Sequence, residues 1–454
     1  SGRSEFAFSL DGRPLAASVT TNEGSSAVGG MWPGLQVDGV MDSDGVDRLA
    51  VRFEDGAVSL SGYGFSARGI DGAADWRDGS LVASALHVAT LESLASPAWI
   101  APVAIDAEAA DDGGDLAFEA SASDPLGTFV LDASGRHGPE RTSAAIRLYP
   151  IRFVPGATEI SDLSPRLAEW VTEAAGLVEF EGRVERTEEG LTGAGTLQLQ
   201  GLSATVSGVP IEDVRSEIRL ASLLPPATEP AQTLTIARVD LGMPLEDGVA
   251  VFDLADNGRL SVERLDFAFA GGRLFAEPFT VDSVARGDIG FVLRAEDVQL
   301  AEFLASSRIE GIAGSGTLSG RMPVRLSDGG IRLDDGVLAA ETDGVLRYTP
   351  DDLPDFLRGD DVRSKMLREV LTNFHYDDLS LAVSGESGEG GAQRLTLNAR
   401  GANPDFLEGH PIELAFNFTG PLLGAVRSAV DLSGAAELEE RFEQQEADNE
   451  ENSR

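Results

Sequence analysis

The sequence predicts a mainly β protein, a long, twisted antiparallel β-groove with a few short helices. The first observation is an alternation of apolar and polar residues, which gives a strand one apolar and one polar face. The second is that Asp-Gly and Gly-Gly pairs, which supply the positive φ of tight turns, punctuate these runs. The third is size, because 454 residues of 42% hydrophobic content can bury an extensive core.

The alternation is clearest between residues 311 and 422. Its last run ends at Phe418, with Glu413 and Asn417 between the apolar positions. We predict that the alternate apolar side chains of this region line the groove. These residues are Leu379, Leu381, Val383, Leu395, Leu397, Ile412, Leu414, Phe416 and Phe418.

Residues 1–160 follow the same pattern. A run of Phe6, Phe8 and Leu10 ends at Asp11-Gly12, and a run from Leu49 to Phe53 ends at Asp55-Gly56. Apolar runs of this kind recur about every ten residues, which is the spacing of an all-β fold. We therefore expect about 30 strands, which would extend roughly 140 Å if they stacked as one sheet.

Helical patterns are few. Ser164-Pro165 predicts a helix start, followed by an apolar stripe of Leu167, Trp170, Val171 and Ala174. Leu300, Phe303 and Leu304 predict a shorter helix. The strongest pattern runs from about residue 355 to 374. Its stripe of Val362, Met366 and Val370 predicts a helix that braces the groove.

Composition excludes several function classes. The formal net charge is −41, from 76 acidic and 35 basic residues, which excludes nucleic acid as a partner because binding it needs a basic surface. The absence of cysteine excludes disulfides and thiolate chemistry. Residues 435–454 are acidic and predict a disordered tail.

No catalytic or metal-binding pattern is present, so we expect no enzyme, no metal and no cofactor. The four histidines, His87, His137, His375 and His410, are too scattered to form a ligand motif. The Asp42-Ser43-Asp44-Gly45 segment begins like a calcium loop, but Val46 and Phe53 stand where oxygen ligands are required.

The sequence of residues 316–422 resembles the C-terminal region of the YdbH-like family. This family is also labelled a dicarboxylate transport family, and it belongs to the AsmA-like and TamB-like group of envelope proteins. The resemblance is carried by Asn373, Phe374, Tyr376 and Leu379, by Gly401-Ala402-Asn403-Pro404-Asp405, and by Gly409 and Pro411. It extends over roughly 163–422, and before that only the architecture is similar. We therefore expect an N-terminal groove section (1–160), a YdbH-like region (161–434) and the tail.

The resemblance implies a periplasmic protein that carries phospholipid between the inner and outer membranes without a covalent step. It also implies an inner-membrane anchor preceding this chain. A further implied partner is a small outer-membrane lipoprotein. We expect it to add a strand beside residues 412–418, the last clear strand and therefore an exposed edge.

Two alternatives remain open at this point. One is a passive envelope scaffold whose β-sheets enclose a dry core without cargo. The other is a component of dicarboxylate transport, which would require a cluster of arginines. The 34 arginines are dispersed among 76 acidic residues, so the sequence shows no such cluster.

Overall fold

A computed structural model describes residues 4–21, 24–42, 45–60, 64–188, 190–241, 243–282, 289–306, 310–327, 330–351, 353, 357–387, 393–420 and 427–433. The chain forms two compact units. Unit 1 comprises Ser1–Leu234 and Leu254–Asp256, and unit 2 comprises Thr235–Asp253 and Asn257–Arg454. Strands make up 71% of the structure, so the predicted mainly β fold is confirmed.

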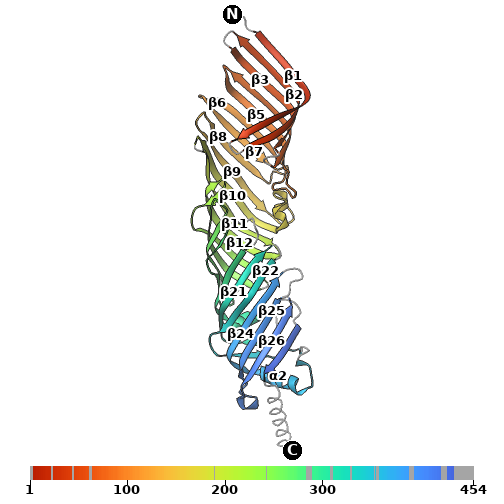
Figure 1. The fold of residues 1–454 in the computed structure, drawn as a ribbon, viewed down its shortest axis with the longest axis vertical. Helices are drawn as coiled ribbons and strands as arrows, with labels where there is room; N and C mark the ends of the chain where they lie inside the picture. The colour runs from red at the N-terminus through yellow and green to blue at the C-terminus, as the bar shows by residue number, and fades with distance from the viewer. Residues whose placement is uncertain are drawn as a thin grey trace, which may run out of the picture. The chain divides into compact units, whose positions relative to one another are not determined.

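Unit 1 is an antiparallel meander in which each strand from β1 to β12 pairs with the next (Figure 1). Two 3₁₀ turns, η2 (Ile160–Asp162) and η3 (Leu167–Glu169), lie between β9 and β10. The strands are β1 (Ser4–Thr21), β2 (Gly24–Asp42), β3 (Gly45–Leu60), β4 (Phe65–Arg77), β5 (Ser80–Ser93), β6 (Val103–Asp112), β7 (Asp115–Ser123), β8 (Val130–His137), β9 (Thr142–Phe153), β10 (Val171–Thr187), β11 (Gly190–Val206), β12 (Val209–Leu223) and β13 (Pro226–Thr228). The division between the units falls within β14 (Gln232–Asp240).

Unit 2 is built on a second antiparallel run, in the order β16, β17, β19, β21, β22, β24, β25, β26 and β27. A short second row, β20 and β23, joins the beginning of β24. The elements are β15 (Pro244–Leu254), β16 (Leu260–Phe269), β17 (Gly272–Ala276), β18 (Phe279–Val281), β19 (Ile289–Gln299), α1 (Leu300–Ser306), β20 (Ile312–Gly314), β21 (Thr317–Ser327), β22 (Gly330–Ala340), β23 (Gly344–Tyr348), α2 (Val362–Thr372), β24 (Phe374–Ser387), β25 (Gln393–Ala402), η6 (Leu407–Gly409), β26 (Ile412–Gly420) and β27 (Arg427–Ser433).

Several Asp-Gly pairs that predicted turns lie inside strands instead. Strand β1 runs through Asp11-Gly12, and β3 runs through Asp55-Gly56 with a shift in register. Asp55 has φ 52° and Asp335, in β22, has φ 48°, which is the geometry of a β-bulge rather than of a chain reversal. The first strands are consequently 16 to 19 residues long, longer than the predicted spacing allows.

Two predicted helices are shorter than expected. The helix predicted at 355–374 is α2 and begins at Val362, because Asp361 caps it by accepting a hydrogen bond from the Ser364 backbone N–H. The stripe beginning at Leu167 forms only η3, and β10 starts at Val171. There the ladder of β10 with β11 takes over, since Val171 pairs with Val206. The short helix predicted at Leu300 is confirmed as α1.

The expected open edge at residues 412–418 is wrong. Strand β26 pairs with β25 on one side and with β27 on the other, where Phe416 is opposite Val430. The prediction treated the sequence after Pro421 as a polar tail and overlooked the short alternation of Val430, Asp431 and Leu432 in β27. The predicted tail at 435–454 lies outside the described residues.

Candidate functional site: an apolar sheet face in each unit

The strand register of unit 1 places apolar residues opposite one another from strand to strand. One row crosses nine successive strands, β4 to β12, and every member of it is apolar. The row consists of Ile70, Val88, Ile105, Ala122, Leu131, Leu148, Phe180, Leu197 and Ile218. We call the side of the sheet that carries it the apolar face of unit 1.

The opposite side is polar. A single step along each strand gives the row Asp71, His87, Asp106, Ser121, Asp132, Arg147, Glu181, Thr196 and Arg219. Cross-strand pairs on this face include His87 with Asp106, at 2.7 Å, and Arg147 with Glu181, at 2.5 Å. The charged side chains of this row therefore lie on the side away from the apolar face, where they keep the sheet hydrated.

Phenylalanine and glycine are paired on the apolar face. Phe53 is directly opposite Gly72, and Phe118 is opposite Gly135. A Cβ atom added to either glycine would collide with the phenylalanine ring, so each ring lies across its glycine. Phe6 and Gly39 form a third such pair. The rings therefore cover the neighbouring backbone and leave a smooth apolar surface.

Much of this face in unit 1 is only half-buried. Ile70 and Val88 are buried, at 6% and 7% exposure. From Ile105 to Ile218 the other members of the row keep intermediate exposure. The buried clusters of unit 1 are small, one around Ile70 and one around Phe153. In the described part of unit 1 the helical segments are η2 and η3, so no longer helix covers this face.

Unit 2 carries an equivalent row, but there it is buried. The row begins with Phe267 and Leu274, and every member other than Gly320 is 8% exposed or less. The row consists of Phe267, Leu274, Ala295, Gly320, Leu338, Leu381, Leu397 and Phe416. These side chains form one large cluster with residues of α1, β23 and α2.

Helix α2 supplies much of the cover. Met366 and Val370 are 0% exposed, Leu367 and Leu371 are buried beside them, and Val362 is half-buried against the same cluster. Figure 1 shows α2 at one end of β24, β25 and β26. Burial of four such side chains stabilises unit 2 by several kcal/mol, at roughly 1.5–3 kcal/mol each. The role of Val362, Met366 and Val370 as a brace stays a prediction, although their position is compatible with it.

A buried amide fixes the end of α2. Asn403 is 1% exposed and donates hydrogen bonds to the backbone carbonyls of Glu369, at 2.8 Å, and Val370, at 3.4 Å. Both carbonyls lie in the last turn of a helix that ends at Thr372, where backbone N–H donors are lacking, and the Thr372 hydroxyl also donates to Glu369 at 2.7 Å. Arg368 donates to the carbonyls of Leu357 and Gly359 near the other end. In the sequence, Gly401 to Pro404 has the pattern of a turn, and that pattern gives no indication of this contact.

Eight of the nine predicted lining residues share the apolar face of unit 2, and the side chain of the ninth, Phe418, lies outside the described part of the structure. Leu379 of β24 and Leu414 of β26 are both opposite Ala399 of β25. Leu381, Leu397 and Phe416 form the next row across the same three strands. Val383, Leu395 and Phe418 are joined by backbone pairing in a third. Ile412, Leu414 and Phe416 are buried at 5% exposure or less. The structure brings them together, whereas their contact with a ligand stays a prediction.

The polar face of unit 2 holds a buried carboxylate. Asp266 is 8% exposed and accepts hydrogen bonds from Arg264 and, at 2.6 Å, from Arg273. Burial works against ionisation, but the two arginines outweigh it and hold the pKa of Asp266 below its ordinary value. Asp266 is therefore a charge held between neighbouring strands of the sheet.

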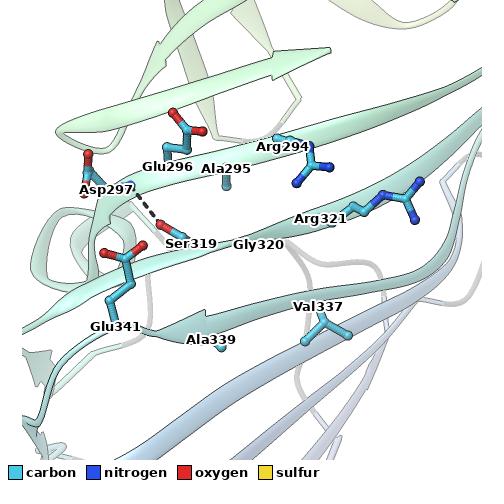
Figure 2. Close-up of a pocket in the computed structure, with 10 residues that line it drawn as sticks. All are labelled: Arg294, Ala295, Glu296, Asp297, Ser319, Gly320, Arg321, Val337, Ala339 and Glu341. Atoms are coloured by element: carbon cyan, nitrogen blue, oxygen red, sulfur yellow. Dashed lines mark hydrogen bonds between the residues drawn. The ribbon is translucent and has the colours of Figure 1, made fainter. Parts of the chain in front are cut away.

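A shallow depression lies on the polar face above β19, β21 and β22 (Figure 2). Arg294 and Arg321 stand at one end, and Glu296, Asp297 and Glu341 stand at the other. Glu277 pairs with both arginines, at 2.6 Å and 3.8 Å. Glu277 offsets part of the charge of the two arginines, and three further carboxylates line the depression, so it is not the cluster of arginines that a dicarboxylate would require.

The described residues contain neither a metal-ligand cluster nor a membrane-spanning helix. No group of three or more His, Cys, Asp or Glu side chains there is arranged to hold a metal ion. Among the same residues, no helix combines the length and apolar character needed to cross a bilayer.

Comparison with known proteins identifies one family. The model of the YdbH-like family, described as intermembrane phospholipid transport protein YdbH, matches residues 18–447. The match covers nearly the whole chain, well beyond the 163–422 over which the sequence resemblance was recognised. No curated protein and no solved structure matches the chain.

Proposed function

The chain belongs to the YdbH-like family of intermembrane phospholipid transport proteins, and we propose that its apolar faces hold the acyl chains of phospholipids in transit between the two membranes. Lipids would move by diffusion along apolar side chains while their headgroups stay in water. This function includes no covalent step, no enzyme activity and no cofactor. It assigns the protein to the periplasmic part of the cell envelope.

The observation that carries this proposal is the half-buried apolar row of unit 1. A soluble protein seldom leaves a broad apolar surface accessible unless a ligand or partner uses it. Nine neighbouring strands contribute to this row without a polar interruption. Acyl chains need such a lining, because they offer no group to which a polar side chain could bind.

Photocrosslinking tests which face meets the lipid. A photoreactive amino acid at Ile218, on the apolar face of β12, should capture radiolabelled phospholipid during expression in a bacterial envelope. The matched control is Glu217, the next residue of the same strand, whose side chain lies on the exposed polar face. Equal labelling at 217 and 218 would contradict the proposal.

The predicted lining of unit 2 belongs to the same proposal. Photoreactive groups at Leu414 and Phe416 should capture lipid more than groups at Glu413 and Asn417, and the yield should be below that at Ile218. The lower yield is expected because the side chains of Leu414 and Phe416 are already buried against unit 2. Absence of any capture in unit 2 would restrict transport to unit 1.

The membrane anchor and the lipoprotein partner are proposals of the same kind. The anchor would precede this chain in the inner membrane. The small outer-membrane lipoprotein would add a strand near the C-terminus, beside β27 instead of β26. Deletion of 405–454 should abolish co-purification of such a lipoprotein, and retained binding would move the contact elsewhere.

The scaffold alternative has one observation in its favour. The apolar face of unit 2 is closed by α1 and α2, as a dry structural core would be. Unit 1 does not share this closure, so the scaffold explains only part of the chain. Mass spectrometry of lipids extracted from the purified protein decides between the two, because a scaffold would carry no stoichiometric lipid.

A further inference from the structure

The two edges of the sheet in unit 1 differ in chemistry. At one edge, which we call the turn edge, the connections at 78–79, 113–114 and 138–141 are short and rich in Asp and Gly. At the other edge, which we call the aromatic edge, connections at 94–102, 124–129 and 154–170 expose large apolar side chains. These are Leu94, Trp99, Leu126, Val154, Leu167 and Trp170, each 43% exposed or more. Val46, Leu191 and Leu224 are exposed apolar residues at or beside the turn edge, at 46%, 48% and 66%.

The aromatic edge contains a built corner that adjoins the apolar face. Ile160 and Leu163 pack into the buried cluster around Phe153, together with Leu148 and Val178 of the apolar face. The Leu163 carbonyl accepts from the Ala101 N–H at 2.8 Å. The corner is therefore held in place by both apolar packing and backbone hydrogen bonds.

The exposed part of this corner combines indole rings with an arginine. The guanidinium carbon of Arg166 lies 4.1 Å from the centroid of the Trp99 ring. Trp99 is 54% exposed and Trp170 is 50% exposed, and these are half of the four tryptophans of the chain. In the part of the chain that the structure describes, Arg166 forms no ion pair with a carboxylate, and its half-buried side chain stacks on Trp99.

Two exposed carboxylates lie on the same connection as this arginine. Glu169 is three residues after Arg166, in η3, and Glu159 precedes η2, where it also accepts a hydrogen bond from the Gly156 N–H. A cation with carboxylates on the same connection is complementary to a zwitterion. Indole rings prefer the boundary between apolar and aqueous phases, which is where a phospholipid headgroup begins.

We propose that the corner of Trp99, Arg166, Glu169 and Trp170 binds the headgroup of a zwitterionic aminophospholipid whose acyl chains lie on the apolar face of unit 1. Arg166 binds the phosphate, Glu169 binds the ammonium group, and the two indoles cover the glycerol region. The proposal rests on the proposed function and adds the class of headgroup. A headgroup with net negative charge is disfavoured, because it meets Glu169 and Glu159 without an ammonium group to offer them.

A competition experiment tests this selectivity on the full chain. Purified protein is incubated with equal amounts of phosphatidylethanolamine and phosphatidylglycerol that carry the same acyl chains, and bound lipids are extracted and counted by mass spectrometry. We expect phosphatidylethanolamine to be in excess on the wild type. Arg166→Gln and Glu169→Gln should each lower that ratio about threefold, which corresponds to the loss of one exposed charge contact. The total amount of bound lipid should stay unchanged.

A matched control is Arg183→Gln, because Arg183 is an exposed arginine on the polar face of β10. This variant should keep the wild-type ratio. Trp99→Phe should keep more of the selectivity than Trp99→Ala, because a phenyl ring preserves the stack with Arg166. Thermal unfolding of each variant establishes that it is folded before its lipids are counted.

The outcomes separate the headgroup proposal from transport itself. If the wild type binds no lipid, the proposed function fails. If it binds lipid but Arg166→Gln and Glu169→Gln leave the ratio unchanged, the headgroup site is wrong and the apolar face remains a lipid carrier. An unchanged ratio combined with loss of a co-purifying protein in Trp99→Ala would make the corner a protein interface and overturn the headgroup assignment.

Discussion

The apolar face of unit 1 is half-open, whereas the equivalent face of unit 2 is filled by the protein's own side chains. Both faces arise from the same alternation of residues on antiparallel strands. Unit 2 differs because it contains two helices, α1 and α2, whose side chains cover its apolar face. An apolar face can therefore be a binding surface or a core, and the strands alone do not decide which.

The covering of unit 2 has a physical consequence for transport. Side chains of α2, such as Met366 and Val370, occupy the volume that acyl chains would otherwise fill. A lipid that reaches this face must compete with a helix that is already packed and held by Asn403. Substitutions on the two faces should therefore change the free energy of unfolding by different amounts.

The largest difference is expected from a charge placed on each face. Met366→Asp buries an unpaired carboxylate in a site of 0% exposure and should lower the free energy of unfolding by about 3–5 kcal/mol. Leu131→Asp places the same group on the half-buried face of unit 1, where water remains close, and should cost about 1 kcal/mol. Urea denaturation of the full chain measures both. Equal losses would mean that α2 does not seal unit 2.

The amide that holds α2 should have the next largest effect. Asn403→Ala removes the Asn403 donor from the carbonyls of Glu369 and Val370, of which Glu369 keeps the Thr372 hydroxyl, and should cost about 1–2 kcal/mol. The control is Asn398→Ala, in β25 just before Asn403, because Asn398 is exposed. Amide hydrogen exchange in the last turn of α2 should accelerate only in Asn403→Ala. Unchanged exchange there would show that packing alone holds the helix.

The Phe–Gly pairs test how tightly the open face is built. Gly72→Ala places a methyl group where the Phe53 ring lies and should destabilise unit 1 by about 1–2 kcal/mol. Gly290→Ala is the matched change in unit 2, because nothing lies within 4 Å of the added Cβ atom. Thermal unfolding should shift only in the first variant. A shift of the same size in both would reduce the effect to general strand propensity.

Much of the fold follows from the sequence because alternation is a local property. The rows that contain Leu381, Leu397 and Phe416 are on one face as expected. The Asp-Gly pairs misled because the positive φ at Asp55 suits a bulge as well as a turn. Only the pairing with the neighbouring strand decides between these structures, and the residues around Asp55 do not show that pairing.

The site is harder to predict because it depends on which segments cover a face. The stripe of α2 indicated an apolar partner, and the structure supplies one. The stripe at Leu167 and Trp170 looked equally helical, yet pairing of β10 with β11 overrides it and leaves both side chains exposed. Asn403 gave no signal, because an Asn before Pro is typical of an ordinary turn.

The smallest expected effect concerns charge on the polar faces and depends on pH. In unit 1 the pair of Arg147 and Glu181 is exposed at both side chains, so it should contribute less than about 1 kcal/mol. In unit 2, burial opposes ionisation of Asp266, but hydrogen bonds from Arg264 and Arg273 lower its pKa in the folded state. A lowered folded pKa stabilises the protein above the unfolded pKa, near ~4, and the contribution is lost as pH falls through the folded value.

Asp266→Asn should therefore be less stable than the wild type at pH 6, by about 1 kcal/mol, and the gap should narrow as the pH falls below ~4. The difference between the two proteins is the quantity to measure, because the many other carboxylates titrate in both. Arg273→Gln in the Asp266→Asn background should add little, since its partner charge has already been removed. A gap that stays constant from pH 6 to pH 2 would mean that Asp266 contributes through its shape and not through its charge.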